Sequence, residues 1–250
     1  MKIVATVQVR MNSSRLPGKV LMNILGKPIL GYLLERLNRS KLINEIVVAT
    51  SENKENDAIE KFCVKNNYTI FRGSENNVTS RIIGALEKND ADIAVEIYGD
   101  CPLIDHRIVD ELIQYYLDHQ NNYDFVTNGM KTTYPPGLEV EVYPLSVLKK
   151  AYEFSSNPDE LEHGTYIVRK HDEIFRIKNI EAPKNLYYPD LELELDSEED
   201  FHVIKKIIEN LYKLNDDFSA LEIIEFLDKN PDIRDLNKNV YRRWKKMRDE

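Results

Sequence analysis

Two patterns of apolar residues alternate along the first 130 residues, one typical of strands and one typical of helices. Short apolar runs predict buried strands, and each run is followed by a segment whose apolar residues recur at helical spacing. Strands joined by helices in this way form a mostly parallel sheet that is covered by helices on both faces. We therefore predict an α/β fold with a central parallel sheet. The predicted strands are 2–9, 44–51, 69–73, 91–100 and 123–129, and the predicted helices are 27–40, 53–66, 78–89 and 105–120.

The pattern changes after about residue 130. Residues 137–144 alternate strictly, with Leu138, Val140 and Val142 on one face and Glu139 and Glu141 on the other, which predicts a half-exposed strand. No repeat or linker is visible, so we predict a single domain over 1–250 with a smaller subregion at roughly 130–185. The later predicted helices are 145–155, 159–170, 197–214 and 218–238 (the last ending in a turn), and the extended segments are 173–182 and 191–196.

Charge is spread unevenly along the chain. The formal net charge is −9, yet residues 1–41 hold eight Lys or Arg and one acid. A basic segment on an acidic protein favours a small anionic ligand over nucleic acid, which the rest of the surface would repel. Within this segment, Arg36, Arg39 and Lys41 are typical of a solvated helix end, where cations suit the helix dipole.

Compartment and class follow from what the sequence lacks. No apolar run approaches the roughly 20 residues that cross a bilayer, and polar residues follow the first strand too soon for a signal peptide. Cys63 and Cys101 have neither metal-site spacing nor a disulfide framework. We expect a cytoplasmic protein with no membrane partner.

A basic loop directly follows the first predicted strand. It contains Arg10, Arg15, Gly18 and Lys19, and ligands of open α/β sheets bind at this edge, outside the carboxyl ends of the strands. Cations and exposed backbone N–H groups suit a polyphosphate, although an ordinary basic turn is the alternative. The loop has neither the phosphate-binding P-loop pattern nor the Gly-x-Gly-x-x-Gly of dinucleotide folds.

Two aspartates are predicted at the same edge of the sheet. Asp100 ends the strand 91–100, and Asp196 ends the extended segment 191–196. A carboxylate beside a polyphosphate needs a cation between them, and Mg²⁺ bridges carboxylates and phosphate oxygens. We therefore expect Mg²⁺ on Asp100 and Asp196, although Asp196 could instead be a helix cap.

Several segments together resemble a known family. "QVRMNSSRLPGKVL", "FRGSENNVTSR", "GDCPLID", "GLEVEVY", "EHGTYI" and "LDSEEDF" follow one another as in the SpsF-like (spore coat polysaccharide) cytidylyltransferases, relatives of the enzymes that make CMP-linked Kdo and neuraminate. The resemblance implies a GT-A-like, Rossmann-related nucleotidyltransferase fold. It also implies a homodimer, in which the subregion at 130–185 meets the partner and shapes the acceptor pocket.

The resemblance implies a reaction and a role for each site residue. The enzyme would transfer CMP from CTP to a sugar or sugar-acid acceptor for surface glycan synthesis, with Mg²⁺ bound and pyrophosphate released. Arg10, Arg15 and Lys19 would hold the triphosphate and assist catalysis together with Asp100. Nucleotide contacts are implied for Gln8, Arg10, Met11, Ser13, Arg15, Lys19, Arg72, Ser74, Arg81 and Asp100, and acceptor contacts for Glu139, Glu141, Glu162 and His163.

Some of these assignments have structural alternatives. Arg72 and Ser74 also suit an ordinary turn, and Glu139 and Glu141 a solvent-facing strand. Glu162 and His163 could contact the dimer partner or be structural.

The sequence departs from the family at a few positions. Relatives usually have basic residues near Glu96 and Glu192, and Asp-Gly-Leu-Asp where this chain has Pro136 to Glu139. Extra carboxylates repel an anionic acceptor, so a neutral or amine-bearing acceptor, or a sugar phosphate held elsewhere, is favoured, and the base stays open. The alternatives are another nucleoside triphosphate, a non-sugar phosphorylated acceptor, a GT-A glycosyltransferase and a non-catalytic nucleotide-binding homologue.

Overall fold

The computed structural model describes residues 1–154, 158–162 and 164–242. The strands are β1 (Ile3–Gln8), β2 (Asn23–Ile24), β3 (Lys27–Pro28), β4 (Glu45–Ser51), β5 (Thr69–Gly73), β6 (Ile93–Tyr98), β7 (Phe125–Thr127), β8 (Glu141–Pro144) and β9 (Ile177–Asn179). The helices are α1 (Ile29–Leu37), α2 (Asp57–Lys65), α3 (Val78–Lys88), α4 (His106–His119), α5 (Leu145–Phe154), α6 (Pro158–Glu162), α7 (Tyr166–Lys170), α8 (Glu198–Leu211), α9 (Ala220–Lys229) and α10 (Pro231–Arg234).

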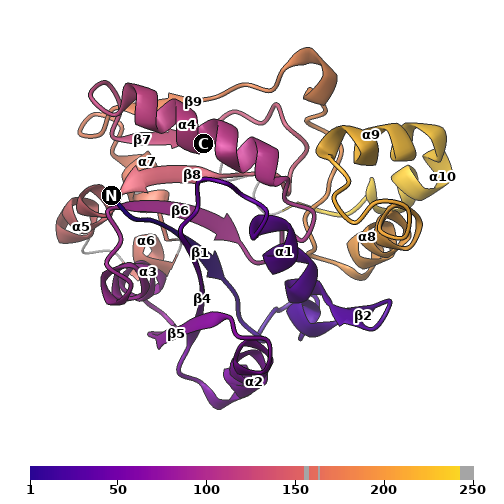
Figure 1. Cartoon of the computed structure of the whole chain (residues 1–250), viewed down its shortest axis with the longest axis horizontal. Helices are drawn as coiled ribbons and strands as arrows, with labels where there is room; N and C mark the ends of the chain where they lie inside the picture. The colour runs from indigo at the N-terminus through magenta and orange to yellow at the C-terminus, as the bar shows by residue number, and fades with distance from the viewer. Residues whose placement is uncertain (155–157, 163, 243–250) are drawn as a thin grey trace.

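A seven-stranded sheet forms the centre of the molecule (Figure 1), in the order β5-β4-β1-β6-β8-β7-β9. Strands β5, β4, β1 and β6 are parallel to one another, whereas β8 is antiparallel to both of its neighbours, β6 and β7. The predicted α/β fold with a mostly parallel central sheet is therefore confirmed. The antiparallel β8 lies in the predicted subregion at 130–185, whose acceptor and dimer roles stay a prediction.

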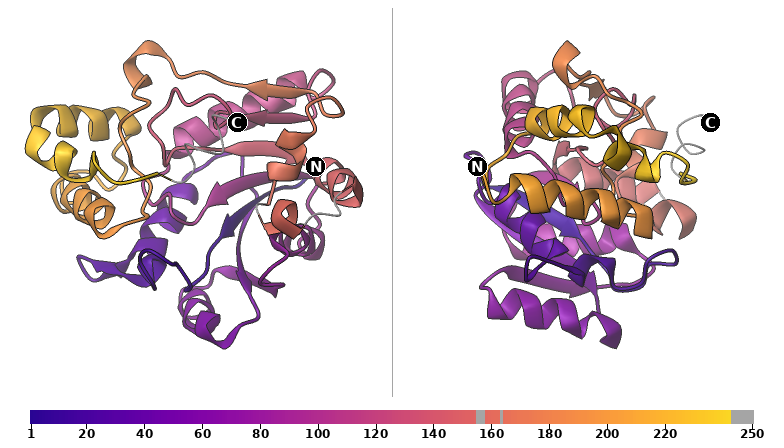
Figure 2. Two further views of the ribbon diagram at one scale, coloured as in Figure 1. Left: turned by 180° about the vertical axis from the view of Figure 1, so that it is seen from behind. Right: turned by 90° about the vertical axis from the view of Figure 1, so that its right-hand side faces the viewer.

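Helices cover both faces of the sheet, and each face has its own apolar core. Helices α1, α2, α4, α8 and α9 pack on one face, and α3, α5 and α7 on the other. Seen from behind in Figure 2, α3 and α5 lie side by side on the second face. Alternate residues of β1 feed the two cores, which explains why that run is apolar almost throughout.

The segment 137–144 differs from its prediction. The strand β8 begins only at Glu141, and both Glu139 and Glu141 are buried rather than half exposed. Leu138, Val140 and Val142 face the first core as expected. The glutamates are covered as well: Thr165 and Arg169 contact Glu141, and Glu139 lies against Gly137 and Cys101. The prediction of a half-exposed strand is therefore wrong.

Arg36 also differs from its prediction as a solvated helix end. It is buried, its Nε donates to the carbonyl of Ile104 at 2.8 Å, and its Nη2 donates to the carbonyl of Phe218 at 2.9 Å. The prediction for Arg36 is wrong because two chain segments that are distant in sequence, at Ile104 and at Phe218, close over the end of α1.

Two further predicted segments are shorter or less regular than expected. Within the described residues, 159–170 contains parts of two short helices, α6 and α7, and 191–196 is extended but pairs with no strand of the sheet. No helix in the described part of the chain combines the length and the apolar character needed to span a membrane.

Candidate functional site

The basic loop after β1 folds into a compact turn. Gly18 has a φ of 72°, in the left-handed region that favours glycine, and its N–H donates to the Met11 carbonyl at 2.9 Å. Ser13 Oγ accepts from the Leu16 N–H at 3.2 Å, and the Met11 N–H donates to Asn56 Oδ1 at 2.8 Å. These bonds turn the chain so that Lys19 enters the protein at the carboxyl edge of the sheet.

Lys19 is the centre of a charged cluster. Its Nζ donates to Asp196 Oδ1 at 2.9 Å, to Asp100 Oδ2 at 3.2 Å and to the Leu195 carbonyl at 2.6 Å. Arg15 Nη2 lies 2.6 Å from Asp196 Oδ2. Two cations of the loop and both predicted metal ligands are therefore brought together at one edge of the sheet.

The environment of Lys19 favours its positively charged form. The side chain is only 8% exposed, and burial by itself lowers its pKa. The charges of Asp100 and Asp196 outweigh burial, so the pKa of Lys19 is raised above its usual value. The ammonium group is thus fully present at neutral pH.

Backbone contacts fix the segment that carries Asp196. The Leu195 N–H donates to the Asp100 carbonyl at 2.8 Å, and the Leu193 N–H donates to the Pro136 carbonyl at 2.7 Å. Gly137 has a φ of 102°, and a Cβ there would lie 2.6 Å from the Leu193 carbonyl carbon. Only glycine allows so close an approach, which sets the distance between this segment and the loop before β8.

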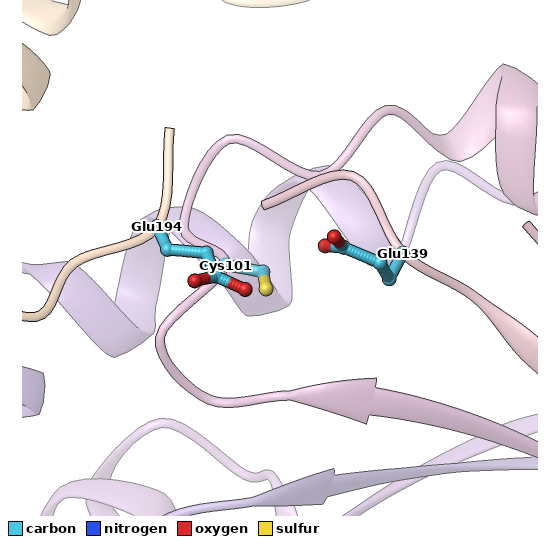
Figure 3. Close-up of side chains that lie close together, drawn as sticks. All are labelled: Cys101, Glu139 and Glu194. Atoms are coloured by element: carbon cyan, nitrogen blue, oxygen red, sulfur yellow. The ribbon is translucent and has the colours of Figure 1, made fainter. Parts of the chain in front are cut away.

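A second group of side chains extends the site beyond the predicted residues. The Sγ of Cys101 and the carboxylates of Glu139 and Glu194 all lie within 4.8 Å of one another, and the two glutamates point toward the cysteine from separate segments (Figure 3). Burial raises the pKa of Glu194 well above its usual value, and the charges of Glu139 and Asp100 raise it further. Glu139 also accepts from the Gly137 N–H at 2.7 Å.

Sequence reasoning did not single out Glu194. The signal was present in the alternation of 191–196, because an extended chain places every second side chain on one side. Glu194 therefore shares a side with Asp196.

Three of the residues predicted to bind nucleotide meet beside the end of β1. The Nη1 of Arg81 donates to the Ser74 carbonyl at 2.7 Å, and its Nε donates to Gln8 Oε1 at 3.4 Å. Burial lowers the pKa of Arg81 from its usual value. Their contact with a nucleotide stays a prediction.

Arg10 lies at the rim of the site. It is about half exposed, with its guanidinium 3.6 Å from Glu75 and 3.9 Å from Glu162. Glu162 is thus brought close to the loop, and its acceptor contact stays a prediction. His163 lies outside the described residues.

Arg72 is placed differently from the other predicted nucleotide contacts. Its Nη1 lies 2.7 Å from Asp57 Oδ1 and 2.5 Å from Glu60 Oε2, and its Nε donates to the Ser51 carbonyl at 3.1 Å. These contacts hold β5 to α2 and direct the guanidinium toward that helix. Arg72 lies in β5 rather than in a turn, and its nucleotide role stays a prediction.

Glu96 and Glu141 form a buried carboxyl pair on adjacent strands. They are register partners on β6 and β8, and each is 1% exposed. Glu96 Oε2 accepts from the Tyr143 hydroxyl at 2.9 Å, while Glu141 accepts from the Tyr98 hydroxyl at 3.1 Å.

The surroundings of this pair favour the protonated form of Glu96. Glu141 also accepts from the Thr165 hydroxyl and lies 3.7 Å from Arg169. Burial, with the charge of Glu141, raises the pKa of Glu96 to about 8. The protonated form of Glu96 is thus favoured at neutral pH, and the predicted acceptor contact of Glu141 stays a prediction.

Replacing Glu96 with glutamine should reduce the loss of stability that occurs as the pH rises. The folded state keeps a proton on Glu96 that the unfolded chain releases above a pH of roughly 4.5, so stability falls as pH rises from there through about 8. Glutamine keeps the shape and does not ionise. Thermal unfolding between pH 6 and 9 should show a smaller fall in Tm for Glu96→Gln than for the wild type and for Glu209→Gln, a control on the surface of α8. Three parallel curves would contradict the prediction.

The chain is similar to known proteins. A family profile described as "Cytidylyltransferase" matches residues 4–239. The spore coat polysaccharide biosynthesis protein SpsF of Bacillus subtilis (strain 168) is 31% identical over 235 residues, which cover 92% of this chain and 95% of that protein. A 3-deoxy-manno-octulosonate cytidylyltransferase of Geobacter metallireducens is 35% identical over 113 residues, 45% of this chain and 44% of that protein.

A solved structure is similar over almost the full length. It is that of a cytidylyltransferase from Leptospira borgpetersenii, with a TM-score of 0.89 and 36% sequence identity, and the match covers 97% of this chain and 100% of that chain. The predicted resemblance and fold are confirmed.

Proposed function

The chain belongs to the cytidylyltransferase family, and from this premise we propose that it transfers CMP from CTP to a sugar or sugar-acid type acceptor with release of pyrophosphate. One observation carries the proposal. Lys19 and Arg15, from the loop after β1, meet Asp100 and Asp196 at the carboxyl edge of the sheet. Cations for a triphosphate and carboxylates for a divalent metal are thus available in one place.

The donor set fits Mg²⁺. Asp100 and Asp196 offer carboxylate oxygens, the ligands that Mg²⁺ prefers, and both lie within 3.2 Å of the same Lys19 nitrogen. When bound to these two residues, Mg²⁺ would neutralise phosphate charge and polarise the α-phosphoryl group.

The side chains of this protein would position the triphosphate rather than react with it. An acceptor oxygen attacks the α-phosphorus in line, and Lys19 and Arg15 stabilise the charge that develops on the leaving pyrophosphate. Arg10 is exposed at the rim, where it can steady the triphosphate. Cys101 is no candidate nucleophile, because burial raises the pKa of its thiol well above the usual value.

The acidic residues of the site bear on the acceptor. Glu96 holds a proton and Glu192 lies 3.6 Å from Arg242, so the charges at these two positions are compensated. Glu139 remains in one group with Cys101 and Glu194, and the raised pKa of Glu194 favours the neutral form of that side chain. A carboxylate at Glu139 favours a neutral or amine-bearing acceptor over one that presents its own carboxylate to it. A role in surface glycan synthesis and a homodimer are parts of the proposal that rest on the family resemblance.

Pyrophosphate release tests the proposal. CTP, UTP, GTP and ATP are each supplied with Mg²⁺ and a panel of sugars, amino sugars, sugar acids, sugar phosphates and phosphorylated alcohols. We expect release with CTP and one acceptor class, and the amino sugars should outperform the matched sugar acids. If no acceptor gives pyrophosphate release, the thermal shift of the protein with each nucleotide is measured. A shift with CTP supports the triphosphate site, and no shift with any nucleotide contradicts the proposal.

A further inference from the structure

A buried contact lies behind the turn that carries Asp196. Asp200, in the first turn of α8, is fully buried. Its Oδ2 accepts from the backbone N–H groups of Asp196 at 3.0 Å and Ser197 at 2.9 Å. One carboxylate thus fixes the backbone of Asp196, whose side chain bonds Lys19.

The C-terminal segment holds that carboxylate in place. Arg242 is 4% exposed, and its Nη1 and Nη2 donate to the two oxygens of Asp200 at 2.9 and 2.6 Å. Asn237 Nδ2 donates to Asp200 Oδ1 at 2.7 Å and to the Glu192 carbonyl at 3.1 Å. Two residues near the end of the described chain therefore form hydrogen bonds with both ends of the segment 192–200.

The geometry of this contact restricts the turn strongly. A guanidinium that bonds both carboxylate oxygens fixes the plane of the carboxylate as well as its position. The orientation of the Asp200 carboxylate therefore depends on Arg242.

We propose that Arg242 is a positioning residue for the site: through Asp200 it sets where the Asp196 carboxylate lies, and so how tightly the site binds a divalent metal. This inference rests on the proposed function, because that function makes Asp196 a metal ligand. Arg242 lies beyond the residues 4–239 that the family profile matches. Residues that orient metal ligands typically change metal affinity by 10- to 100-fold when they are replaced.

The test measures metal affinity apart from turnover. Arg242→Gln removes the charge and the two parallel bonds, Arg242→Lys keeps the charge alone, and Arg234→Gln is the control, since Arg234 pairs with Asp228 on the surface of the same segment. Free Mn²⁺ is measured by electron paramagnetic resonance in titrations of each full-length protein with CTP present. The Mg²⁺ dependence of pyrophosphate release is then measured with saturating CTP and the acceptor found for the wild type.

We expect Arg242→Gln to weaken Mn²⁺ binding by about tenfold or more and to raise the half-saturating Mg²⁺ by a similar factor. At saturating Mg²⁺ its kcat should recover to within about threefold of the wild type. Arg242→Lys should fall between Arg242→Gln and the wild type, and Arg234→Gln should match the wild type. If Arg242→Gln does not fold, Arg242→Lys carries the test through the same metal titration.

The failures can be told apart. If the wild type binds Mn²⁺ and the Arg242 variants bind it equally well, the positioning role is wrong, whatever happens to their Tm or kcat. If the wild type itself neither binds Mn²⁺ nor releases pyrophosphate, the proposed function fails and the inference fails with it.

Discussion

Replacing Asp100 with asparagine should lower kcat/KM for CTP by about a thousand-fold. Asparagine has nearly the same shape and can still accept from Lys19, which bonds Asp100 Oδ2 at 3.2 Å. It removes the negative charge that a carboxylate ligand gives to Mg²⁺. Losing one preorganised electrostatic contact in an active site typically costs roughly a hundred- to a thousand-fold in rate, and loss of a metal ligand belongs at the upper end. Pyrophosphate release at several Mg²⁺ concentrations measures the effect.

The control for Asp100→Asn is Asp118→Asn. Asp118 accepts from Gln114 on the exposed side of α4, outside the site, so its replacement should leave activity unchanged. Asp100→Asn should keep the wild-type Tm within a few degrees, because Asp196 still pairs with Lys19. Activity within tenfold of the wild type in a folded Asp100→Asn protein would contradict the metal role of Asp100.

The meeting of Asp100 and Asp196 could be predicted from local signals. Each follows an extended run of alternating or apolar residues, and the end of β6 places Asp100 at the edge where α/β sheets bind ligands. The basic loop follows β1, the neighbour of β6 in the sheet. The positions of the predicted strand ends were therefore enough to place Asp100 and the loop at one edge, whereas the structure brings Asp196 there through a segment that bonds the Asp100 carbonyl.

The environment of the glutamates could not be predicted in this way. Alternation shows that Glu139 and Glu141 share a face, but not whether a distant segment covers that face. In the structure Thr165 and Arg169, from the α7 region, contact Glu141 there. The proton on Glu96 likewise depends on its burial and on Glu141 across the strand pair, which are tertiary facts.

Arg242 shows the same limit at the other end of the chain. Nothing in the sequence around Arg242 points to a partner for it. In the structure its guanidinium lies in the interior, on Asp200. A buried acid at the third position of α8 had a sufficient local explanation as part of the capping box of Ser197. The capping box therefore gave no indication that Asp200 also binds Arg242.

Replacing Lys19 with methionine should affect both stability and turnover. Methionine fills a similar volume, but it leaves Asp100 and Asp196 without the ammonium group that bonds both of them. Breaking a buried charge pair by removing one partner costs about 3–5 kcal/mol of unfolding free energy. Because the raised pKa of Lys19 keeps it charged throughout the neutral range, the full loss applies at pH 7. Pyrophosphate release should also fall by about a hundred-fold or more, since Lys19 would stabilise the leaving group.

A divalent metal provides the sharper test of Lys19→Met. In the wild type the ammonium group and a metal both draw on Asp100 and Asp196, whereas in Lys19→Met a metal is the stronger remaining source of positive charge. Saturating Mg²⁺ should therefore raise the Tm of Lys19→Met by several degrees more than that of the wild type or of Lys205→Met, a surface control on α8. The metal should restore stability without restoring turnover, because it cannot stabilise the leaving pyrophosphate from the position of the Lys19 side chain. Equal Tm shifts in all three proteins would show that Lys19 and the metal do not share these carboxylates, and would count against the site as a metal site.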